Sequence, residues 1–130
     1  MGQPAAKQGD KVMATDIHIV MLPGTPPVPT PIPHPFMGTI DANLSQDVKI
    51  MSMPAATVDS TASNLPPHIP QGGPFQKPPS NKATIKIGST TVKINGKMAA
   101  RNGDTAMTCN DPSDLPVGKV IAVGTVFIGG

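Results

Sequence analysis

The sequence predicts an all-β fold of short strands joined by long proline-rich loops. Its 11 Ile and 10 Val outnumber 4 Leu, and 12 Thr add to the β-branched residues that pack well on pleated sheets. The 17 prolines recur so often that few stretches could sustain three helical turns. Short segments also alternate apolar and polar residues with a period of two, as strands with one buried face do.

Four segments carry the strand signal. The first two alternate apolar and polar residues, and the last two are more continuously apolar: residues 84–87, 91–94, 120–123 and 126–128. Two proline-rich stretches, Gly24 to Pro35 and Pro66 to Pro79, are interpreted as loops longer than a compact repeat requires. The length of 130 residues predicts a single domain covering residues 1–130.

Composition excludes several classes of protein. The formal net charge is only +2, the Lys and Arg residues form no basic stripe, and there is no Trp or Tyr to stack on bases, so we expect no nucleic-acid partner. No apolar run approaches the roughly 18–20 residues of a membrane-spanning helix. The N-terminus, Met-Gly-Gln-Pro, lacks a basic-then-apolar signal segment, so we expect no signal peptide and no export by the ordinary secretory route.

The chain contains an internal repeat. A shift of 44 residues places Val48-Lys49-Ile50 on Val92-Lys93-Ile94 and Ala55-Ala56 on Ala99-Ala100 without a gap. A shift of 94 residues places the segment 5–10 on the segment 99–104. The sequence is therefore interpreted as three units of a Pro-Ala-Ala element, a loop and a Val-x-Ile strand, at approximately 4–50, 54–94 and 98–128.

One such unit cannot bury its own apolar face, so the three copies must pack on one another. The last strand, at residues 125–130, has no Pro-Ala-Ala element after it, and the first Pro-Ala-Ala element, at 4–6, has no strand before it. We therefore expect the two chain ends to meet and close a three-part ring. The paired alanines suit a place where three backbones crowd together, and the Gly-Asp that follows them suits a tight turn.

The three histidines and the one cysteine are candidate metal ligands: His18, His34, His68 and Cys109. His18 follows Pro4 by 14 residues, and His68 follows Pro54 by the same 14 residues. If the three units close about an axis, these loops meet at one end. Neutral imidazoles and a thiolate are ligands that Zn²⁺ accepts, and four of them complete a tetrahedral structural site.

Other interpretations of these residues stay open. A histidine in a polar loop is often solvated, and a lone cysteine is often a small buried hydrophobe. Asp16, two residues before His18, and Asp111, two residues after Cys109, could each serve as a base for a catalytic metal or as a partner that orients a ligand. No nucleophile elbow, phosphate-binding loop or dinucleotide fingerprint is present, so we expect no enzyme activity.

Several segments together resemble the PAAR-repeat family, in particular the PAAR-like tip proteins of contractile injection systems such as type VI secretion and phage-tail-like particles. These segments are PAAK at 4–7, PAAT at 54–57, the run from Val92 to Asp104, and the closing TVFIGG. In two places the chain departs from the family pattern. Met98 replaces the proline of the third copy, and Val58-Asp59-Ser60 stands where the other two copies have Gly-Asp.

The resemblance implies a small cone of three β-rich repeats, with one structural Zn²⁺ near its sharp apex held by three His and one Cys, which map onto the four candidate ligands. It implies that one copy caps the blunt end of a trimeric β-helical spike of the valine-glycine repeat (VgrG) or phage-spike type. The cone would then sharpen a spike that is driven through a target membrane, with possible effector cargo, and would be delivered outside or into the target cell.

Two alternative functions remain at this point. One is a small zinc-dependent hydrolase or toxin carried by the same apparatus. The other is a largely disordered interaction module that presents extended Pro-rich segments such as Pro26-Pro27 and Pro78-Pro79 to a partner.

Overall fold

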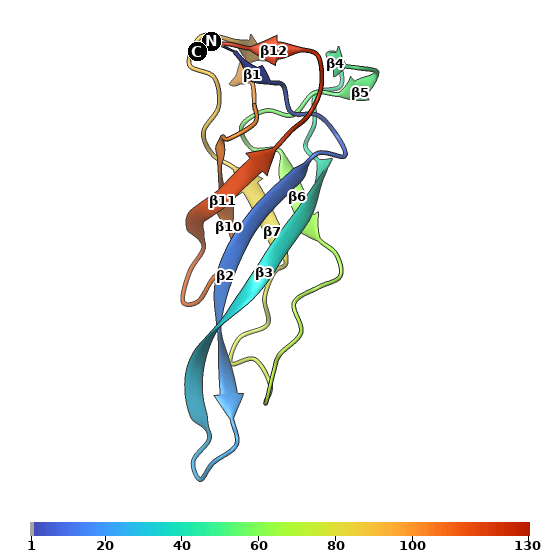
Figure 1. Cartoon of the computed structure of the whole chain (residues 1–130). Helices are drawn as coiled ribbons and strands as arrows, with labels where there is room; N and C mark the ends of the chain where they lie inside the picture. The colour runs from blue at the N-terminus through green and yellow to red at the C-terminus, as the bar shows by residue number, and fades with distance from the viewer. Residues whose placement is uncertain (1) are drawn as a thin grey trace.

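The computed structural model of the chain describes residues 2–130 and contains only β-strands, turns and loops in that range. The molecule tapers from a wide end, where both chain ends lie, to a narrow end formed by one long hairpin (Figure 1). This confirms the predicted all-β, conical fold. No helix long and apolar enough to cross a membrane occurs among the described residues.

Residues 2–130 form twelve strands. In chain order they are β1 (Gln3–Pro4), β2 (Lys11–Leu22), β3 (Val28–Ala42), β4 (Lys49–Ile50), β5 (Met53–Pro54), β6 (Thr61–Asn64), β7 (Lys82–Ile85), β8 (Lys93–Ile94), β9 (Lys97–Met98), β10 (Thr105–Thr108), β11 (Leu115–Ile121) and β12 (Phe127–Ile128). The four strands that the sequence predicts correspond to β7, β8, β11 and β12, with boundaries shifted by a few residues.

Six of these strands close into an antiparallel barrel in the order β10-β11-β2-β3-β6-β7. Every second residue of these strands points inward, so one cluster of buried apolar side chains fills the interior. Its largest members are Phe36, Ile40 and Ile85, with Val12 and Val120 beside them. A core with so few aromatic side chains is small, which matches the low aromatic content of the chain.

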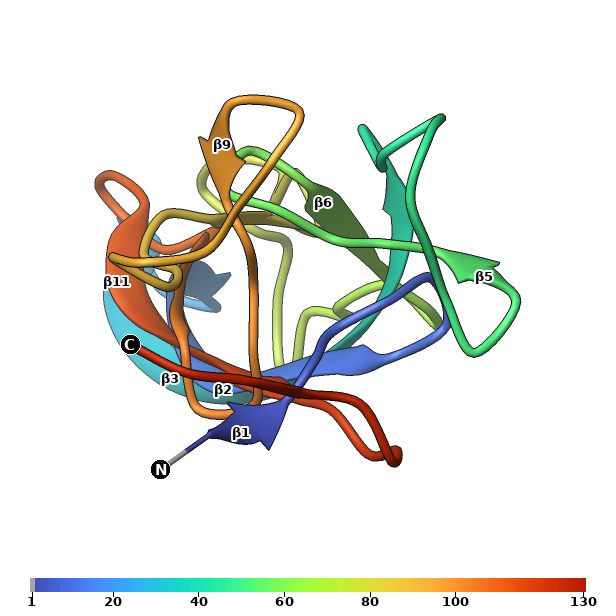
Figure 2. The ribbon, with the colours of Figure 1, turned by 90° about the horizontal axis from the view of Figure 1, so that it is seen from above.

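Three strand pairs stand around the rim of the wide end: β4 with β5, β8 with β9, and β1 with β12. Figure 2 shows β1, β5 and β9 at three separate points around the barrel axis. The third pair joins the two ends of the chain, with Gln3 opposite Ile128 and Pro4 opposite Phe127. The expected closure of the ring by the chain ends is therefore present.

A ring of backbone hydrogen bonds ties the three Pro-Ala-Ala elements together. Ala6 N donates to Ala100 O (2.9 Å), Ala100 N donates to Ala56 O (3.0 Å), and Ala56 N donates to Ala6 O (3.0 Å). All three side chains are fully buried. A larger side chain here would push the three backbones apart, which explains why alanine recurs at this position in all three copies.

The preceding alanines form a second layer toward the wide end. Ala5, Ala55 and Ala99 pack with three isoleucines, one from each strand pair: Ile50, Ile94 and Ile128. The isoleucines belong to the Val-x-Ile segments of the repeat, so the repeat in the sequence corresponds to a repeated contact. Each copy supplies one alanine and one isoleucine to a common layer.

The turn after each Pro-Ala-Ala element is also repeated. Gly9 and Gly103 have φ of 92° and 88°, and Asp59, which replaces glycine in the second copy, has φ of 79°. The departure of Val58-Asp59-Ser60 from Gly-Asp therefore leaves the turn conformation unchanged. Ser60 Oγ accepts a hydrogen bond from Thr57 N (2.9 Å), in the place where Asp104 accepts one from Arg101 N (2.7 Å).

The interpretation of Gly24 to Pro35 as a loop is wrong for residues 28–35. These residues belong to β3, which pairs with β2 over twelve consecutive residue pairs, from Lys11 with Thr39 to Leu22 with Val28. The second proline-rich stretch, Pro66 to Pro79, forms no strand of its own, although Phe75 makes one isolated bridge to Val20.

Proline is tolerated in β3 because it recurs at every second residue. Pro33, Pro31 and Pro29 lie opposite Ile17, Ile19 and Met21 of β2. The amides of these three β2 residues point away from β3, toward Asn110 Oδ1 (2.6 Å), Asp111 Oδ2 (2.8 Å) and Pro74 O (2.8 Å) respectively. In an antiparallel pair the opposite residue also turns its N–H outward at such positions, so proline costs no ladder hydrogen bond there.

Candidate metal centre

The four predicted ligands come from different parts of the chain and meet inside the narrower half of the molecule. His18 lies on β2, His34 lies on β3, His68 lies in the loop after β6, and Cys109 directly follows β10. His18 and His34 occupy inward-facing positions of their strands and are almost fully buried. The strand alternation therefore directs both imidazoles toward the interior.

The three imidazoles form a compact triangle. The ring centroid of His18 lies 5.0 Å from that of His68 and 5.6 Å from that of His34, and the His34 and His68 centroids are 5.4 Å apart. Cys109 Sγ lies 3.6 Å from His18 Nε2. Donor atoms of Asp16, His18, His68 and Cys109 all lie within 4.8 Å of one another.

His34 is adjacent to this group but stands outside the set of donors within 4.8 Å. Its Nδ1 lies 2.8 Å from Ile32 O, and because a carbonyl can only accept, Nδ1 carries the proton. Its Nε2 is therefore a lone-pair acceptor, and it is buried without a hydrogen-bond partner among residues 2–130. A metal ion is one group that would satisfy such a nitrogen.

The second unsatisfied imidazole nitrogen of the site belongs to His18. Its Nδ1 is buried with no hydrogen-bond partner in the described part of the chain, and the nearest acidic oxygen, Asp111 Oδ1, is 3.6 Å away. Burial lowers the pKa of His18 from its ordinary 6.5, and this effect outweighs the opposite pull of the Asp111 carboxylate. The imidazole is therefore neutral at pH 7, the state that binds a metal.

Asp16 lies at the centre of a buried polar network. Its Oδ1 accepts a hydrogen bond from Thr108 Oγ1 (2.5 Å), and its Oδ2 lies 2.9 Å from His68 Nε2 and 3.5 Å from Cys109 Sγ. The Asn110 amide is a further donor to Oδ1. This carboxylate can act either as a metal ligand or as the group that orients His68 and Cys109.

His68 uses both ring nitrogens within the protein. Asn64 Nδ2 lies 3.3 Å from its Nδ1, and its Nε2 faces the Asp16 carboxylate. His68 must exchange one of these hydrogen bonds in order to bind a metal. Asn64 and Asn81 position this histidine, because Asn81 Oδ1 also accepts a hydrogen bond from the His68 amide (2.8 Å).

The Cys109 thiol is neutral in this environment. Burial, and then the Asp16 carboxylate beside it, raise the pKa of the thiol to about 11. A divalent cation reverses this effect, because a coordinated thiol is deprotonated at neutral pH. The orphaned nitrogens of His18 and His34, the third imidazole, His68, and the buried thiol together form a donor set that fits Zn²⁺.

The loop from Pro66 to Pro79 covers the site. The ring of Phe75 lies 5.3 Å from the His34 ring and 5.8 Å from the His18 ring, measured between centroids. The loop is attached to β2 by backbone hydrogen bonds from Met21 N to Pro74 O and from Gln76 N to Ile19 O, both 2.8 Å long. Phe75 therefore covers the His18 and His34 rings on the side of this loop.

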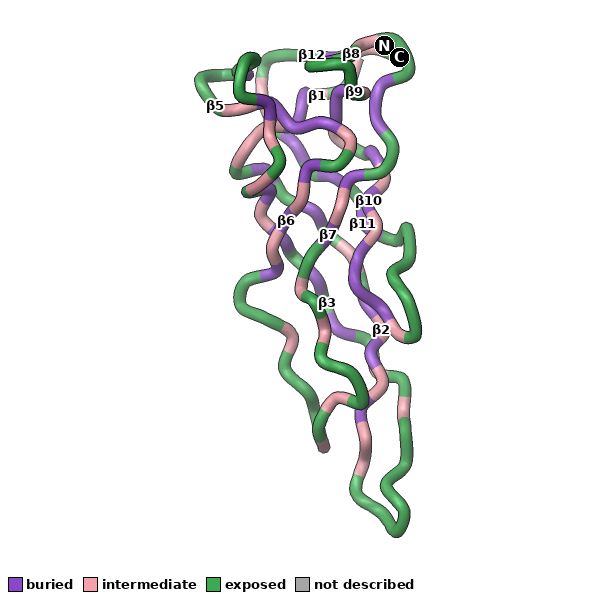
Figure 3. The backbone as a smooth tube through the Cα atoms, turned by 180° about the vertical axis from the view of Figure 1, so that it is seen from behind, coloured by how far each residue is buried: buried purple, intermediate pink, exposed green. Residues whose placement is uncertain are grey.

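The cluster is close to the narrow end without being its extreme point. His18 pairs with Ile32, and four further residue pairs of the β2–β3 ladder, ending at Leu22 with Val28, lie beyond it. At about 3.3 Å per residue, the hairpin extends roughly 13 Å past the candidate ligands. Figure 3 shows that most of this projecting hairpin is exposed, whereas the middle of the molecule is mostly buried.

Sequence reasoning left two contributors unassigned. The sequence indicates Asp16 only as a possible base or orienting group, although Asp16 and His18 stand two residues apart and so share the inner face of one strand. No local pattern in the sequence indicates Phe75 or shows that a residue in this loop returns to β2. The structure gathers His18, His68 and Cys109 with Asp16, and places His34 next to them.

A family model described as the PAAR motif matches residues 33–109, more than half of the chain. The comparison with curated proteins gives no match. The matched range contains His34, His68 and Cys109 together with the second and third alanine pairs. Together with the three-part β-fold, this match shows that the chain belongs to the PAAR-motif family of structural spike-tip proteins, which associate with the spike proteins of contractile injection systems.

Proposed function

We propose that this protein caps and sharpens a trimeric β-helical spike, with its wide end docked on the spike and its narrow hairpin leading. The repeated strand pairs of the wide end are the observation that carries this proposal. Three similar faces of one chain suit three identical chains of a VgrG-like or phage-spike-like partner, at one copy per trimer. The projecting hairpin, stiffened by alternate prolines on the edge of β3, suits the leading point.

The proposed cofactor is one structural Zn²⁺ held by His18, His34, His68 and Cys109, with Asp16 beside them. The two unsatisfied imidazole nitrogens and the buried thiol support this assignment. When bound, the metal would cross-link β2, β3, the loop after β6 and the segment after β10. The almost complete burial of His18, His34 and Cys109 favours a structural ion over a catalytic one, which keeps a position open for water.

The same proposal includes the route of the protein. It would be made in the bacterial cytoplasm, assembled at the spike tip and carried outside or into a target cell, where it contacts the target membrane only transiently. Effector cargo is included in the proposal as a passenger of the tip, without an assigned attachment site. No nucleic-acid partner is proposed.

Docking can be tested by mixing the purified protein with a candidate trimeric spike and measuring the mass of the complex by light scattering. We expect one copy for each spike trimer. Phe127→Asp places a charge on the wide end, where Phe127 is 61% exposed, and should weaken the complex. Val28→Asp changes a residue of the narrow end that is 53% exposed and should leave the complex intact. If both variants or neither variant weakened it, docking through the wide end would be refuted.

A further inference from the structure

The wide end contains three seams, each formed where the tip of one strand pair meets the segment leading into the next. Each seam is named here for the residue that directly follows the alanine pair beside it, which is Lys7, Thr57 or Arg101. One hydrogen bond crosses each seam. In the Lys7 seam, Thr125 N donates to Met51 Sδ. In the Arg101 seam, Ser89 Oγ donates to Gly129 O, and in the Thr57 seam, Ser45 Oγ donates to Asn95 Oδ1.

A cationic side chain closes two of the three seams. Lys7 Nζ donates to Val123 O (2.7 Å) and to the Asp10 carboxylate (3.1 Å). Arg101 donates through Nη1 to Gly129 O (3.1 Å) and through Nη2 to Asp104 Oδ1 (3.0 Å). In both seams the cation therefore joins the aspartate of its own turn to a backbone carbonyl beside β12, which is that of Val123 before the strand or of Gly129 after it.

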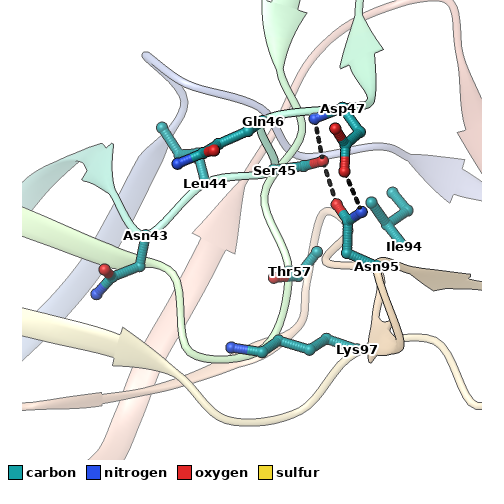
Figure 4. Close-up of a pocket in the computed structure, with 9 residues that line it drawn as sticks. All are labelled: Asn43, Leu44, Ser45, Gln46, Asp47, Thr57, Ile94, Asn95 and Lys97. Carbon is teal, nitrogen blue, oxygen red and sulfur yellow. Dashed lines mark hydrogen bonds between the residues drawn. The ribbon is translucent and has the colours of Figure 1, made fainter.

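The third seam lacks this cation. Thr57 is too short to reach across it, and Ser60 replaces the aspartate that accompanies the cation in the other two copies. A cavity of about 320 Å³ remains in its place. Figure 4 shows this cavity between the segment Asn43–Asp47 on one side and the segment Ile94–Lys97 on the other, with Thr57 between them.

Polar oxygens line the cavity. Ser45 and Asn95 are linked across it, and Asp47 Oδ2 accepts a hydrogen bond from Asn95 Nδ2 (2.7 Å) (Figure 4). The one cation of the lining, Lys97, has its ammonium 3.5 Å from Asp59 Oδ2, a residue outside the lining. Lys97 is therefore paired with Asp59, and the Asp47 carboxylate forms no ion pair with a lysine or arginine among residues 2–130.

We propose that the Thr57 seam receives an arginine side chain from the protein docked on the wide end. The inference rests on the proposed docking function and names one contact within it. The occupant takes the place that Arg101 holds in its own seam. The planar fork of a guanidinium can donate to a carboxylate and to a neighbouring amide or backbone oxygen together, as Arg101 does in its own seam.

The side chain can be tested without the spike. N-acetyl-arginine methylamide is titrated into the ¹⁵N-labelled protein, with N-acetyl-citrulline methylamide, its uncharged isostere, as the matched probe. We expect the arginine probe to shift the amide signals of Ser45, Asp47, Thr57 and Asn95, and to bind at least about fivefold more tightly than the citrulline probe, the effect of one charge-assisted hydrogen bond. Equal binding of the two probes, or shifts elsewhere on the surface, would overturn the proposal.

Two variants test whether the arginine probe binds in the Thr57 seam. Asp47→Asn should weaken the arginine probe at least about fivefold because it removes the carboxylate of the lining. The double variant Thr57→Arg/Ser60→Asp rebuilds the internal ion pair of the other two seams, so we expect it to abolish probe binding and to raise Tm. If the double variant fails to fold, the Asp47→Asn comparison still decides the proposal. Undiminished arginine binding by Asp47→Asn would refute it.

The outcomes separate this contact from docking as a whole. If Phe127→Asp weakens the spike complex while the arginine probe does not bind wild-type protein, the proposed function stands and the seam assignment fails. If the probe binds the seam but no spike is captured by the wide end, the proposed function fails instead.

Discussion

The two ends of this molecule are stabilised in opposite ways. At the wide end one backbone pattern occurs three times, and alanine and isoleucine from each copy pack in a common layer. At the narrow end the three copies differ, since the first continues as the β2–β3 hairpin, the second as the loop from Pro66 to Pro79, and the third as a short connection after Cys109. The repeat therefore determines the wide end, and the exceptions to the repeat form the narrow end.

The difference is also one of chemistry. The wide end satisfies its backbone groups internally, through the hydrogen-bonded ring of Ala6, Ala56 and Ala100. The narrow end buries imidazoles, a thiol and a carboxylate, and two of its buried nitrogens have no partner in the described residues. A buried polar group without a partner costs about 1–3 kcal/mol, so the narrow end is expected to depend on a ligand in a way that the wide end does not.

The largest effect should come from removing the metal. We expect one Zn²⁺ per chain by elemental analysis, and chelation should lower Tm sharply because a structural zinc contributes on the order of 10 kcal/mol. By hydrogen exchange, protection should be lost first in Asp16–Leu22 and in the segment 65–80, while the Ala6, Ala56 and Ala100 amides should stay protected longest. Uniform loss across both ends would contradict the contrast between them.

Single ligand variants should sharpen this result. Cys109→Ser should reduce zinc retention and lower the Tm of the metal-loaded protein, whereas after chelation its Tm should lie close to that of the chelated wild type. His34→Gln should also reduce zinc retention, because His34 Nε2 is one of the proposed donors. An unchanged metal content in Cys109→Ser would remove the cysteine from the ligand set.

Much of the wide end could be predicted from the sequence because its determinants are local and repeated. The repeat units follow from matches at shifts of 44 and 94 residues, and the meeting of the chain ends follows from the unpaired last strand and the unpaired first Pro-Ala-Ala element. The second copy departs from the Gly-Asp turn of the other two, but aspartate at position 59 tolerates the positive φ that glycine adopts in those turns.

The narrow end could be predicted only in part. Its histidines and cysteine stand out by residue type. The first half of β3 could not be predicted, because its many prolines indicate a loop, and proline is compatible with a strand only where the missing N–H would point away from the neighbouring strand. The roles of Asp16 and Phe75 depend on contacts with residues more than forty positions away along the chain. Such contacts are set by tertiary packing, and no period or spacing in the sequence reports them.

After the ligand variants, the next largest effect should come from variants that test whether the three copies contribute equally to stability at the wide end. Ile50→Ala, Ile94→Ala and Ile128→Ala should each lower the free energy of unfolding by about 2–4 kcal/mol, because each leaves a cavity in the same layer. Denaturant unfolding of the metal-loaded protein measures these values. Costs that agree to within about 1 kcal/mol would support equivalence, and one much larger or smaller cost would show that the copies have diverged energetically.

Acidification should act on the narrow end. In the metal-free protein, burial holds the pKa of His18 below 6.5, so between the folded and unfolded pKa values the unfolded chain binds a proton that the folded chain does not. The free energy of unfolding should therefore fall as pH decreases below 6.5, by up to about 1.4 kcal/mol per pH unit for this one proton. His18→Gln should show a shallower slope in chemical unfolding measured at several pH values, and an identical slope would contradict the assignment.

The smallest effect concerns the repeated turn and should have opposite signs in two copies. A Cβ added at Gly103 would meet nothing within 4 Å in the described chain, so Gly103→Ala should cost only the strain of a positive φ, about 1 kcal/mol. Asp59→Gly removes that strain but also loses the exposed ion pair with Lys97 and gains unfolded-chain entropy, so it should stabilise by less than about 1 kcal/mol. Thermal unfolding of both variants decides the matter, because destabilisation by Asp59→Gly would mean that the second copy has adapted to aspartate and that its turn is no longer interchangeable with the other two.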